Sequence, residues 1–345
     1  MRRIYLIRHA HPDFPFGERW CVGARTDLPL GALGRMQAAL LPSVPELRSL
    51  GAVFCSSLSR ARETALSLCP SPRVVEGLEE QDMGVWDGLS FREIRERFPV
   101  LYAMRENDPS LLPEGAESMD AVRARVRRAL LRCLRESEGD IAVVSHRTAI
   151  ESLTGRRELL LHGSVTVLCR DGESCFVEAA GLRPRPPLTR PLAETLLAAA
   201  APGEKVEAHC RAVAAEALRI ARALPVRLDE ELLVSAALLH DVARKEKDHA
   251  LVGAAWLREL GFPDAAAIVE QHHDRSGKDI DEAAILYLAD KCVREDRRVT
   301  LEERFSASGA KCLTPEAKAA HAARREAALG LRDEINRICG HILVE

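Results

Sequence analysis

The first strand-like stretch of the chain reads Ile4-Tyr5-Leu6-Ile7-Arg8-His9-Ala10-His11-Pro12. Its four apolar residues, two of them β-branched isoleucines, predict a short buried strand. Arg8 and His9 follow at the point where that strand ends. Ligands of open α/β sheets bind at the carboxyl ends of the strands, so this pair stands where chemistry is expected. The stretch therefore indicates an α/β fold with a candidate nucleophile at one edge of its sheet.

The first half of the sequence alternates between strand-like and helix-like segments. Further strands are expected at 52–55 and 141–144, and a hairpin at 165–168 and 175–177 turns around Asp171-Gly172. Helices are expected at 31–41, 60–68, 91–98 and 119–135. This alternation predicts an α/β three-layer sandwich with a mostly parallel sheet.

A proline-rich segment divides the chain. Residues 183–191 contain four prolines, which exclude a helix or a central strand and indicate a semi-rigid linker. We therefore expect one domain at 1–182 and a second at 192–345. The second is rich in Ala, Leu, Glu and Arg and is expected to be all-α, with helices at 204–224, 229–242, 247–260, 263–273, 281–294 and 315–340.

Composition excludes several classes of protein. The 345 residues carry a formal net charge of −3, which gives no electrostatic footprint for nucleic acid or for an anionic membrane. We find neither an apolar run of membrane-spanning length nor a secretory signal in the first twenty residues, so we expect a cytoplasmic protein without a membrane segment. The ten cysteines form no CxxC pair and are expected to be small, mostly buried hydrophobes.

Polar residues follow several of the predicted strands. Arg60 comes after the second strand, His146 after the strand at 141–144, and Glu79, Glu80 and Asp82 lie in a loop-like stretch. Arginine presents a planar fork of donors to phosphate oxygens, and a neutral imidazole is a competent nucleophile towards phosphorus. A carboxylic acid nearby can protonate the leaving oxygen. Together these residues predict a phosphoryl pocket.

Five motifs in this order resemble the histidine phosphatase (phosphoglycerate-mutase-like) superfamily. They are Leu6-Ile7-Arg8-His9, Thr26-Asp27-Leu28-Pro29-Leu30 with Gly34 and Gln37-Ala38, Ser56-Ser57-Leu58-Ser59-Arg60-Ala61-Arg62-Glu63-Thr64-Ala65, Glu80-Gln81-Asp82-Met83-Gly84-Val85-Trp86-Asp87-Gly88, and Val144-Ser145-His146. The resemblance covers about the first 180 residues and implies phosphoryl transfer without a cofactor.

The resemblance also implies roles for single residues. His9 would attack phosphorus, Arg8, Arg60 and His146 would bind the phosphoryl oxygens, and Glu80 would be the proton donor, with Glu79 left as an alternative. This chain departs from the family pattern at Ala10 and His11, where Gly and then Glu or Gln are usual. It also departs at Arg147, where Gly is usual, and at Gly115-Ala116-Glu117-Ser118, one residue longer than the usual Gly-Glu-Ser. His11 is expected at the pocket rim or surface, and His162 is expected to be structural.

The second domain concentrates histidine and aspartate on or beside its predicted helices. His209, the pair His240-Asp241, His249, the pair His272-His273 and Asp290 fall within about eighty residues. Such side chains on facing helices are natural ligands of divalent metals. The absence of cysteine beside them argues against a structural zinc site. His321 and His341 are expected at the surface.

This set resembles the HD-domain metal-dependent phosphohydrolases over about residues 204–300. The carrying stretches are Ala208–Ala214, Ala237–Arg244, Asp248–Ala254, Ile268–His273 and Leu288–Lys291. The resemblance implies His209, His240, Asp241 and Asp290 as ligands of a first metal, and His249 with His272 or His273 as further ligands in a binuclear site. It implies metal-assisted hydrolysis with one or two ions of Fe, Mn, Zn, Ni or Mg. Lys245 is a candidate phosphate-binding residue, as are Lys291 and Arg294, and ordinary solvated charge is the alternative for each.

The sequence thus predicts a bifunctional phosphohydrolase that acts on a small phosphorylated metabolite or nucleotide. Phosphomonoester hydrolysis is expected at His9, and hydrolysis of a phosphoester or nucleotide phosphoanhydride is expected in the helical domain. Two alternatives stay open: mutase-like phosphoryl transfer at His9, and a domain that serves only as a nucleotide sensor. The substrates, the metal and the oligomeric state, a homodimer included, stay open as well.

Overall fold

The computed structural model describes residues 2–108, 110–155, 160–172, 174–275, 277, 279–310 and 312–345. The chain divides into two compact units, Met1–Pro186 and Pro187–Glu345. Each unit has its own elements and its own core, and each is described by itself below.

The first unit contains a six-stranded sheet, in the spatial order β3-β2-β4-β1-β5-β6. Its strands are β1 (Arg2–Arg8), β2 (Ala52–Cys55), β3 (Arg73–Val74), β4 (Ile141–Ser145), β5 (Val165–Asp171) and β6 (Ser174–Leu182). The pairs β2–β3, β2–β4 and β1–β4 are parallel, whereas β5 runs antiparallel to both β1 and β6. The expectation of a mostly parallel sheet closed by a hairpin is confirmed.

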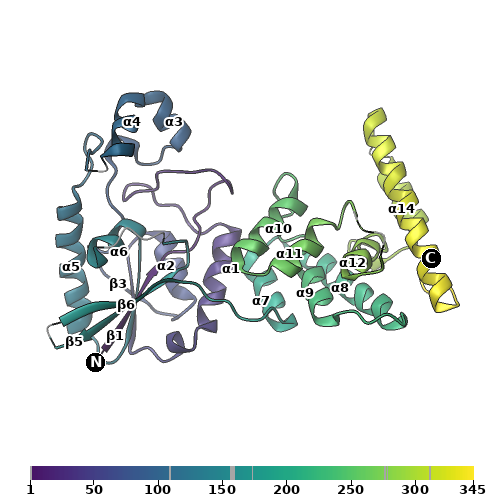
Figure 1. Cartoon of the computed structure of the whole chain (residues 1–345), viewed down its shortest axis with the longest axis horizontal. Helices are drawn as coiled ribbons and strands as arrows, with labels where there is room; N and C mark the ends of the chain where they lie inside the picture. The colour runs from purple at the N-terminus through teal and green to yellow at the C-terminus, as the bar shows by residue number, and fades with distance from the viewer. Residues whose placement is uncertain are drawn as a thin grey trace. The chain divides into compact units, whose positions relative to one another are not determined.

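Helices cover both faces of this sheet. The helices of this unit are α1 (Ala32–Leu40), α2 (Ser59–Leu66), α3 (Phe91–Arg97), α4 (Pro99–Asn107), α5 (Met119–Arg135) and α6 (Arg147–Thr154), with short 3-10 turns at Leu41–Ser43, Pro45–Arg48 and Gly84–Trp86. Figure 1 shows α5 on one side of the strands and α1 and α2 on the other. The first unit is therefore the three-layer arrangement that the sequence predicts.

The alternation of side chains along β1 explains these layers. Ile4 and Leu6 pack with the buried residues of α5 and α6 in one core cluster, while Tyr5 and Ile7 pack with those of α2 in another. A strand buried on both faces reads as a continuous apolar run rather than an alternating one. The run Ile4–Ile7 thus joins two cores and holds Arg8 and His9 at its end.

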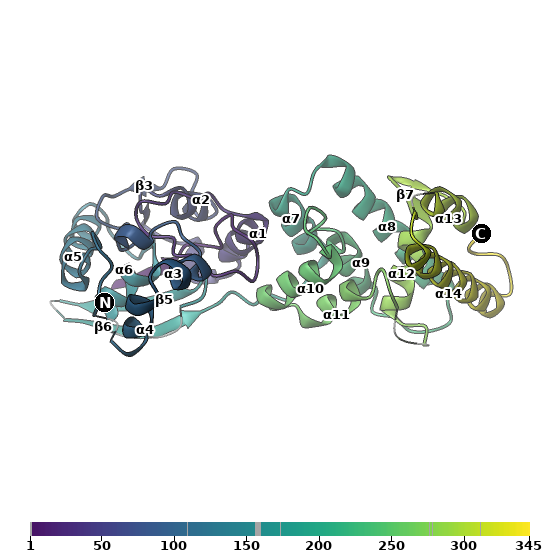
Figure 2. The same ribbon diagram turned by 90° about the horizontal axis from the view of Figure 1, so that it is seen from above.

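The second unit consists almost entirely of helices. They are α7 (Arg190–Ala200), α8 (Glu204–Ala223), α9 (Glu230–Leu239), α10 (His249–Leu260), α11 (Pro263–Glu270), α12 (Glu282–Lys291), α13 (Leu301–Gly309) and α14 (Pro315–Cys339), with a two-stranded hairpin of β7 (Val293–Arg294) and β8 (Arg297–Arg298). Figure 2 shows α14 beside α12, where the Tyr287 hydroxyl donates a 2.9 Å hydrogen bond to the carbonyl of Arg324. The expectation of an all-α unit holds apart from this small hairpin.

Several boundaries differ from the expected ones, and two of them have a clear cause. The predicted linker reaches residue 191, but α7 already begins at Arg190 with Pro191 in its first turn. Proline is tolerated there because the first amides of a helix have no intrahelical acceptor to lose. The helix expected over 281–294 ends at Lys291, because the chain then turns into β7.

The cysteines and the membrane prediction can also be checked against the structure. All ten cysteines are free, and six of them are buried. Among the described residues, no helix is long and apolar enough to cross a membrane.

Candidate functional site

The carboxyl ends of three neighbouring strands bring the first group of polar residues together. His9 follows β1 and His146 follows β4, and these strands are parallel neighbours. The amide of His9 donates to the carbonyl of Ser145 at 2.9 Å, and the ring centroids of His9 and His146 lie 4.9 Å apart. Parallel strands whose ends meet at one edge therefore place two imidazoles side by side, with their ring planes tilted by 57°.

The environment of His9 fixes its protonation and tautomer. Its Nδ1 lies 2.8 Å from the carbonyl oxygen of Ala10, which can only accept, so Nδ1 carries the proton and Nε2 a lone pair. Burial, followed by the charges of His146, Arg60 and Arg8, holds the pKa of His9 well below its usual value. His9 is therefore a neutral imidazole with a free Nε2, which is the form that attacks phosphorus.

Three buried nitrogen atoms near His9 have no hydrogen-bond partner among the described residues: Arg8 Nε, Arg60 Nε and His146 Nδ1. Each side chain is otherwise anchored. Arg60 donates to the carbonyls of Thr26 at 2.7 Å and Gly23 at 3.0 Å, and His146 Nε2 lies 2.9 Å from the Ser56 hydroxyl. Buried donors without acceptors are unusual in proteins, so an anion that accepts from them would satisfy the site.

Charge at this site is carried by the arginines rather than by the histidines. Burial lowers the pKa of Arg8 to about 10, and burial also lowers that of Arg60, yet both stay cationic at neutral pH. Burial and the charges of Arg60 and Arg8 hold the pKa of His146 well below its usual value. The pocket therefore presents two cations and two neutral imidazoles.

Glu79 and Glu80 point to different partners. Glu80 accepts from the amide of Thr148, in the first turn of α6, at 3.2 Å, and its charge acts on both Arg8 and Arg60. Glu79 instead accepts from the Ser57 hydroxyl at 2.8 Å and from the amide of Gly77 at 2.7 Å. This arrangement favours Glu80 over Glu79 as the carboxyl group that faces the pocket.

A salt bridge holds the loop that carries Glu80. Arg125 on α5 pairs with Glu117 at 2.8 Å and donates to the carbonyls of Gly77, Glu79 and Glu80. Glu117, the glutamate of the longer Gly-Ala-Glu-Ser stretch, thus orients Arg125 and lies behind the pocket residues. Arg147 pairs with Glu151 of its own helix at 2.7 Å.

His162 belongs to this pocket, although we expected it to be structural. Its Nε2 lies 2.9 Å from Arg8 Nη2, and its ring centroid lies 5.4 Å from that of His9. No local sequence signal indicates this position, because it depends on the pairing of the sheet. His162 precedes β5, and β5 pairs antiparallel with β1, so the start of β5 meets the end of β1 at Ile7 and Val165.

A second group of polar residues gathers inside the helical unit. Each comes from a helix or from its end: His209 from α8, His240 and Asp241 from the end of α9, His249 from the start of α10, His272 and His273 from the turn after α11, and Asp290 from α12. His240, Asp241, His272 and Asp290 are buried. The structure therefore brings together all the residues that we expected to bind metal.

Backbone carbonyls orient three of these histidines. The Nδ1 atoms of His209, His240 and His272 lie 2.8, 2.7 and 2.6 Å from the carbonyl oxygens of Glu295, Ala237 and Val269. Each Nδ1 therefore carries a proton, and in the neutral ring Nε2 is the atom left to bind a metal. Metal-binding histidines are held in this way in proteins.

The Nε2 atoms of four histidines converge on the two aspartates. Asp290 Oδ1 lies 3.1 Å from His209 Nε2 and 3.7 Å from His240 Nε2. Asp241 Oδ1 lies 3.7 Å from His272 Nε2 and 3.1 Å from His249 Nε2. His240 Nε2, His272 Nε2 and Asp241 Oδ1 are buried without a hydrogen-bond partner among the described residues.

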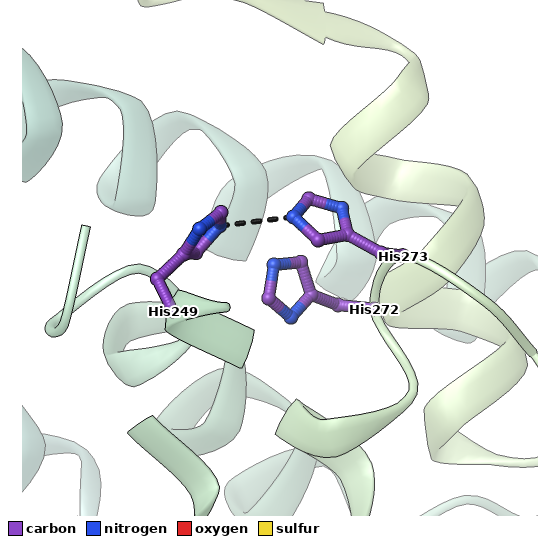
Figure 3. A group of neighbouring side chains, drawn as sticks. All are labelled: His249, His272 and His273. Atoms are coloured by element: carbon purple, nitrogen blue, oxygen red, sulfur yellow. Dashed lines mark hydrogen bonds between the residues drawn. The ribbon is translucent and has the colours of Figure 1, made fainter. Parts of the chain in front are cut away.

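Figure 3 shows a third grouping, in which His249, His272 and His273 point toward one another. The Nε2 atoms of His249 and His273 lie 2.9 Å apart. Potential ligand atoms lie within 4.8 Å of one another in three sets: His209, His240 and Asp290; His240, Asp241 and His272; and His249, His272 and His273. His272 and His273 thus both reach the cluster.

Electrostatics keep this donor set ready for a cation. Burial lowers the pKa of His240 to about 4 and, with the charge of His272, that of His273 to about 3. Burial alone would raise the pKa of Asp290, but Lys291 and His209 outweigh it and hold that pKa well below its usual range. Burial lowers the pKa of His209, but its hydrogen bond to Asp290 and the charge of Asp290 outweigh burial and raise it. Imidazoles beside ionised carboxylates are donor types that bind divalent metals, so these residues fit one.

The nearby cations differ in their positions. Lys245 and Arg294 are exposed, as expected for either phosphate contact or ordinary solvation. Lys291 is buried and donates to Asp290 at 3.1 Å and to the carbonyl of His272 at 2.6 Å, so it holds two of the candidate ligands in place. Arg244, to which we assigned no role, lies 2.8 Å from His249 Nε2 and 3.7 Å from Asp241 Oδ1.

Family models match both units. The histidine phosphatase superfamily (branch 1) matches residues 4–160, and the HD domain matches residues 206–295. A bifunctional protein of Mycobacterium tuberculosis is 35% identical over 157 residues, which are 44% of this chain and 43% of the relative. The chain therefore spans less than half the length of that relative.

Other similar proteins carry the names of phosphatases. The glucosyl-3-phosphoglycerate phosphatase of M. tuberculosis is 32% identical over 130 residues, which are 36% of this chain and 57% of that protein. A solved structure of the mycobacterial glucosyl-3-phosphoglycerate phosphatase with VO3 has a TM-score of 0.47 and 26% identity, and covers 52% of this chain and 99% of that one. The chain therefore contains a domain of the histidine phosphatase superfamily and, after it, an HD domain.

Proposed function

We propose that the chain is a bifunctional phosphohydrolase whose two units are separate catalytic domains. The first hydrolyses phosphomonoesters of small metabolites through a phosphohistidine at His9. The second is a metal-dependent hydrolase of a phosphoester or of a nucleotide phosphoanhydride. One observation supports the first activity. The lone pair on Nε2 of His9 is available beside three buried nitrogen atoms that have no hydrogen-bond acceptor among the described residues.

The first domain works by two displacements at phosphorus. Nε2 of His9 attacks the phosphoryl group, the bond to the leaving oxygen breaks, and Glu80 gives that oxygen its proton. Water then attacks the phosphohistidine, Glu80 takes back a proton, and His9 and inorganic phosphate are released. Arg8, Arg60 and His146 donate to the phosphoryl oxygens in both steps and stabilise their charge.

Steady-state and burst kinetics with an aryl phosphate test this proposal. His9→Ala should abolish turnover and the burst of released alcohol, because no other described nucleophile meets the three donors. The matched control is His341→Ala, which removes an exposed histidine and should retain both. Equal turnover by wild type and His9→Ala, with the activity still bound to the purified protein, contradicts the proposal.

The second domain would hold its metal with His209, His240, Asp241 and Asp290, and His249, His272 and His273 would hold a second ion. A divalent metal, when bound, supplies Lewis acidity to a phosphate ester or anhydride. The chain's own residues orient the candidate ligands, bury one side of the site and lower the pKa values of His240 and His273. Arg244 and Lys245 stand at the exposed side, where a substrate phosphate would approach.

Metal content and activity test this second proposal together. Purified protein should contain one or two equivalents of a divalent metal, and His240→Ala should lose metal and the chelator-sensitive phosphohydrolase activity while keeping the His9-dependent one. A protein that binds nucleotide but shows no chelator-sensitive activity would instead support the sensor alternative. Isotope exchange between phosphorylated isomers, with little hydrolysis, would support the mutase alternative for the first domain.

The fusion suggests sequential use of the two sites. In that scheme the second domain opens a nucleotide anhydride or diester, and the first removes the terminal phosphate from the product. His9→Ala should then accumulate a phosphomonoester, and metal-stripped protein should leave the starting compound intact. Complete processing of one compound by both altered proteins rules this order out.

A further inference from the structure

A row of rings runs outward from the nucleophile of the first domain. His162 lies 5.4 Å from His9 and 5.1 Å from His11 between ring centroids. His11 in turn lies 4.5 Å from Phe14 and 6.3 Å from Phe16. Exposure increases in the same direction, because His9 is buried, His162, His11 and Phe14 are half-buried, and Phe16 is 37% exposed. We call His162, His11, Phe14 and Phe16 the ring wall.

The backbone that carries the ring wall is held firmly. The amide of Gly31 donates to the carbonyl of His11 at 3.1 Å, and the amide of Asp13 donates to that of Pro29 at 2.9 Å. Gly34 of α1 packs so closely that a Cβ there would lie 2.0 Å from the carbonyl oxygen of His11. A wall fixed before binding loses little conformational entropy when a ligand packs on it.

The chemistry of the wall excludes some leaving groups and suits others. Burial and the charge of Arg8 lower the pKa of both His162 and His11, so neither ring supplies a cation for an acidic leaving group. Phe14 and Phe16 offer only apolar faces and edges. Planar rings pack on such surfaces by offset or edge-to-face contacts, whereas a polyol would lose hydration there without gaining acceptors.

We propose that the ring wall selects phosphomonoesters whose alcohol carries a planar aromatic or heteroaromatic ring. With the phosphoryl group at His9, the leaving group lies along His162 and His11, and its ring packs on Phe14 and Phe16. This inference rests on the proposed phosphatase function. Two classes of alcohol carry such a ring: simple aromatic alcohols and nucleosides.

Phosphomonoesters whose leaving alcohols have similar acidity test this selectivity, because their intrinsic reactivities are similar. The set is benzyl phosphate, a nucleoside 5′-monophosphate and glycerol 3-phosphate. The kcat/KM of wild type should be at least about tenfold higher for the two ring-bearing esters than for the glycerol ester. A kcat/KM for the nucleoside ester well above that for benzyl phosphate would show that the ring wall prefers a heterocycle. Equal kcat/KM values would show that it accepts any planar ring.

Substitutions in the wall should act on binding. Phe14→Ala and Phe16→Ala should each lower the ratio of ring-bearing to glycerol kcat/KM by about three- to tenfold, through KM rather than kcat, since the contact is made in ground and transition states alike. Phe16 is exposed, so its removal does not threaten folding. Phe176, 51% exposed on β6, is the matched control, and Phe176→Ala should leave the ratio unchanged.

The outcomes separate the two levels of the proposal. Absence of turnover and of a burst with every ester refutes the phosphatase function itself. Turnover with no preference for rings, or a preference that survives in both Phe14→Ala and Phe16→Ala, overturns the selection by the ring wall while leaving the phosphatase function standing.

Discussion

Removing metal should selectively destabilise the helical domain. Three atoms in its cluster, His240 Nε2, His272 Nε2 and Asp241 Oδ1, are buried without hydrogen-bond partners among the described residues. A buried polar atom left unsatisfied costs about 1–3 kcal/mol, so these atoms together cost at least about 3 kcal/mol when nothing binds them. A metal at a hundred times its Kd stabilises the folded state by about 2.7 kcal/mol, which is of the same size.

This free energy converts into a measurable shift in melting temperature. For a domain of this size, about 1 kcal/mol corresponds to roughly 2–4 °C, so chelation should lower the Tm of the helical domain by about 6–12 °C. The first domain has no part in this cluster and should melt at an unchanged temperature. Differential scanning calorimetry of the full chain, with and without chelator, measures both transitions in one sample.

Two variants make the assay decisive. His240→Ala should show a clearly smaller chelator-induced shift in Tm than wild type, because His240 belongs to two of the three candidate ligand sets. His341→Ala changes an exposed histidine and should show the full shift. The reasoning is refuted if metal-loaded wild type and its chelated form melt alike, or if the shift occurs in the transition of the first domain.

Three further predictions concern single residues. Glu80→Gln should lower kcat for an alkyl phosphate by about a hundredfold but affect an aryl phosphate much less, because an aryl leaving group needs no proton; Glu79→Gln should treat both esters alike. Lys291→Met should weaken metal binding by about 10–100-fold in calorimetric titration, since Lys291 holds Asp290 and the carbonyl of His272; Arg294→Met, at an exposed site, should not. Burial keeps the pKa of His146 below its ordinary value, so the unfolded chain takes up a proton that the folded domain refuses. Below about pH 6.5 this one group should therefore lower the stability in urea by up to about 1.4 kcal/mol per pH unit, and His146→Gln should reduce the total slope by that amount.

Elements with strong local patterns could be predicted from the sequence. The apolar run at Ile4–Ile7 and the amphipathic pattern of 119–135 each determine a strand or a helix by burial alone. The helix at Arg147–Thr154 was missed, because it begins directly after the strand at His146 and has no polar side chain that caps it. Helix α7 was missed for the opposite reason, since the prolines around it indicate a linker while Pro191 occupies its first turn.

The positions of candidate site residues could be predicted where the residue follows a strand or lies at a helix end beside another candidate residue. His9, His146 and the pair His240-Asp241 are of this kind. His162 was not, because its place in the pocket depends on the antiparallel pairing of β5 with β1, which brings distant residues together. Local sequence carries no signal for such pairing.

Trapping the covalent intermediate tests the central claim most directly. The full chain, stripped of metal, is mixed with a phosphomonoester, quenched in alkali and digested, and its peptides are sequenced by mass spectrometry. Phosphate should be found on His9, at up to one group per chain, although no metal is present. The bond should be labile to acid and stable to base. Phosphate on another residue, or none on His9 during demonstrable turnover, would contradict the account of a metal-free phosphohistidine centre joined to a separate metal centre.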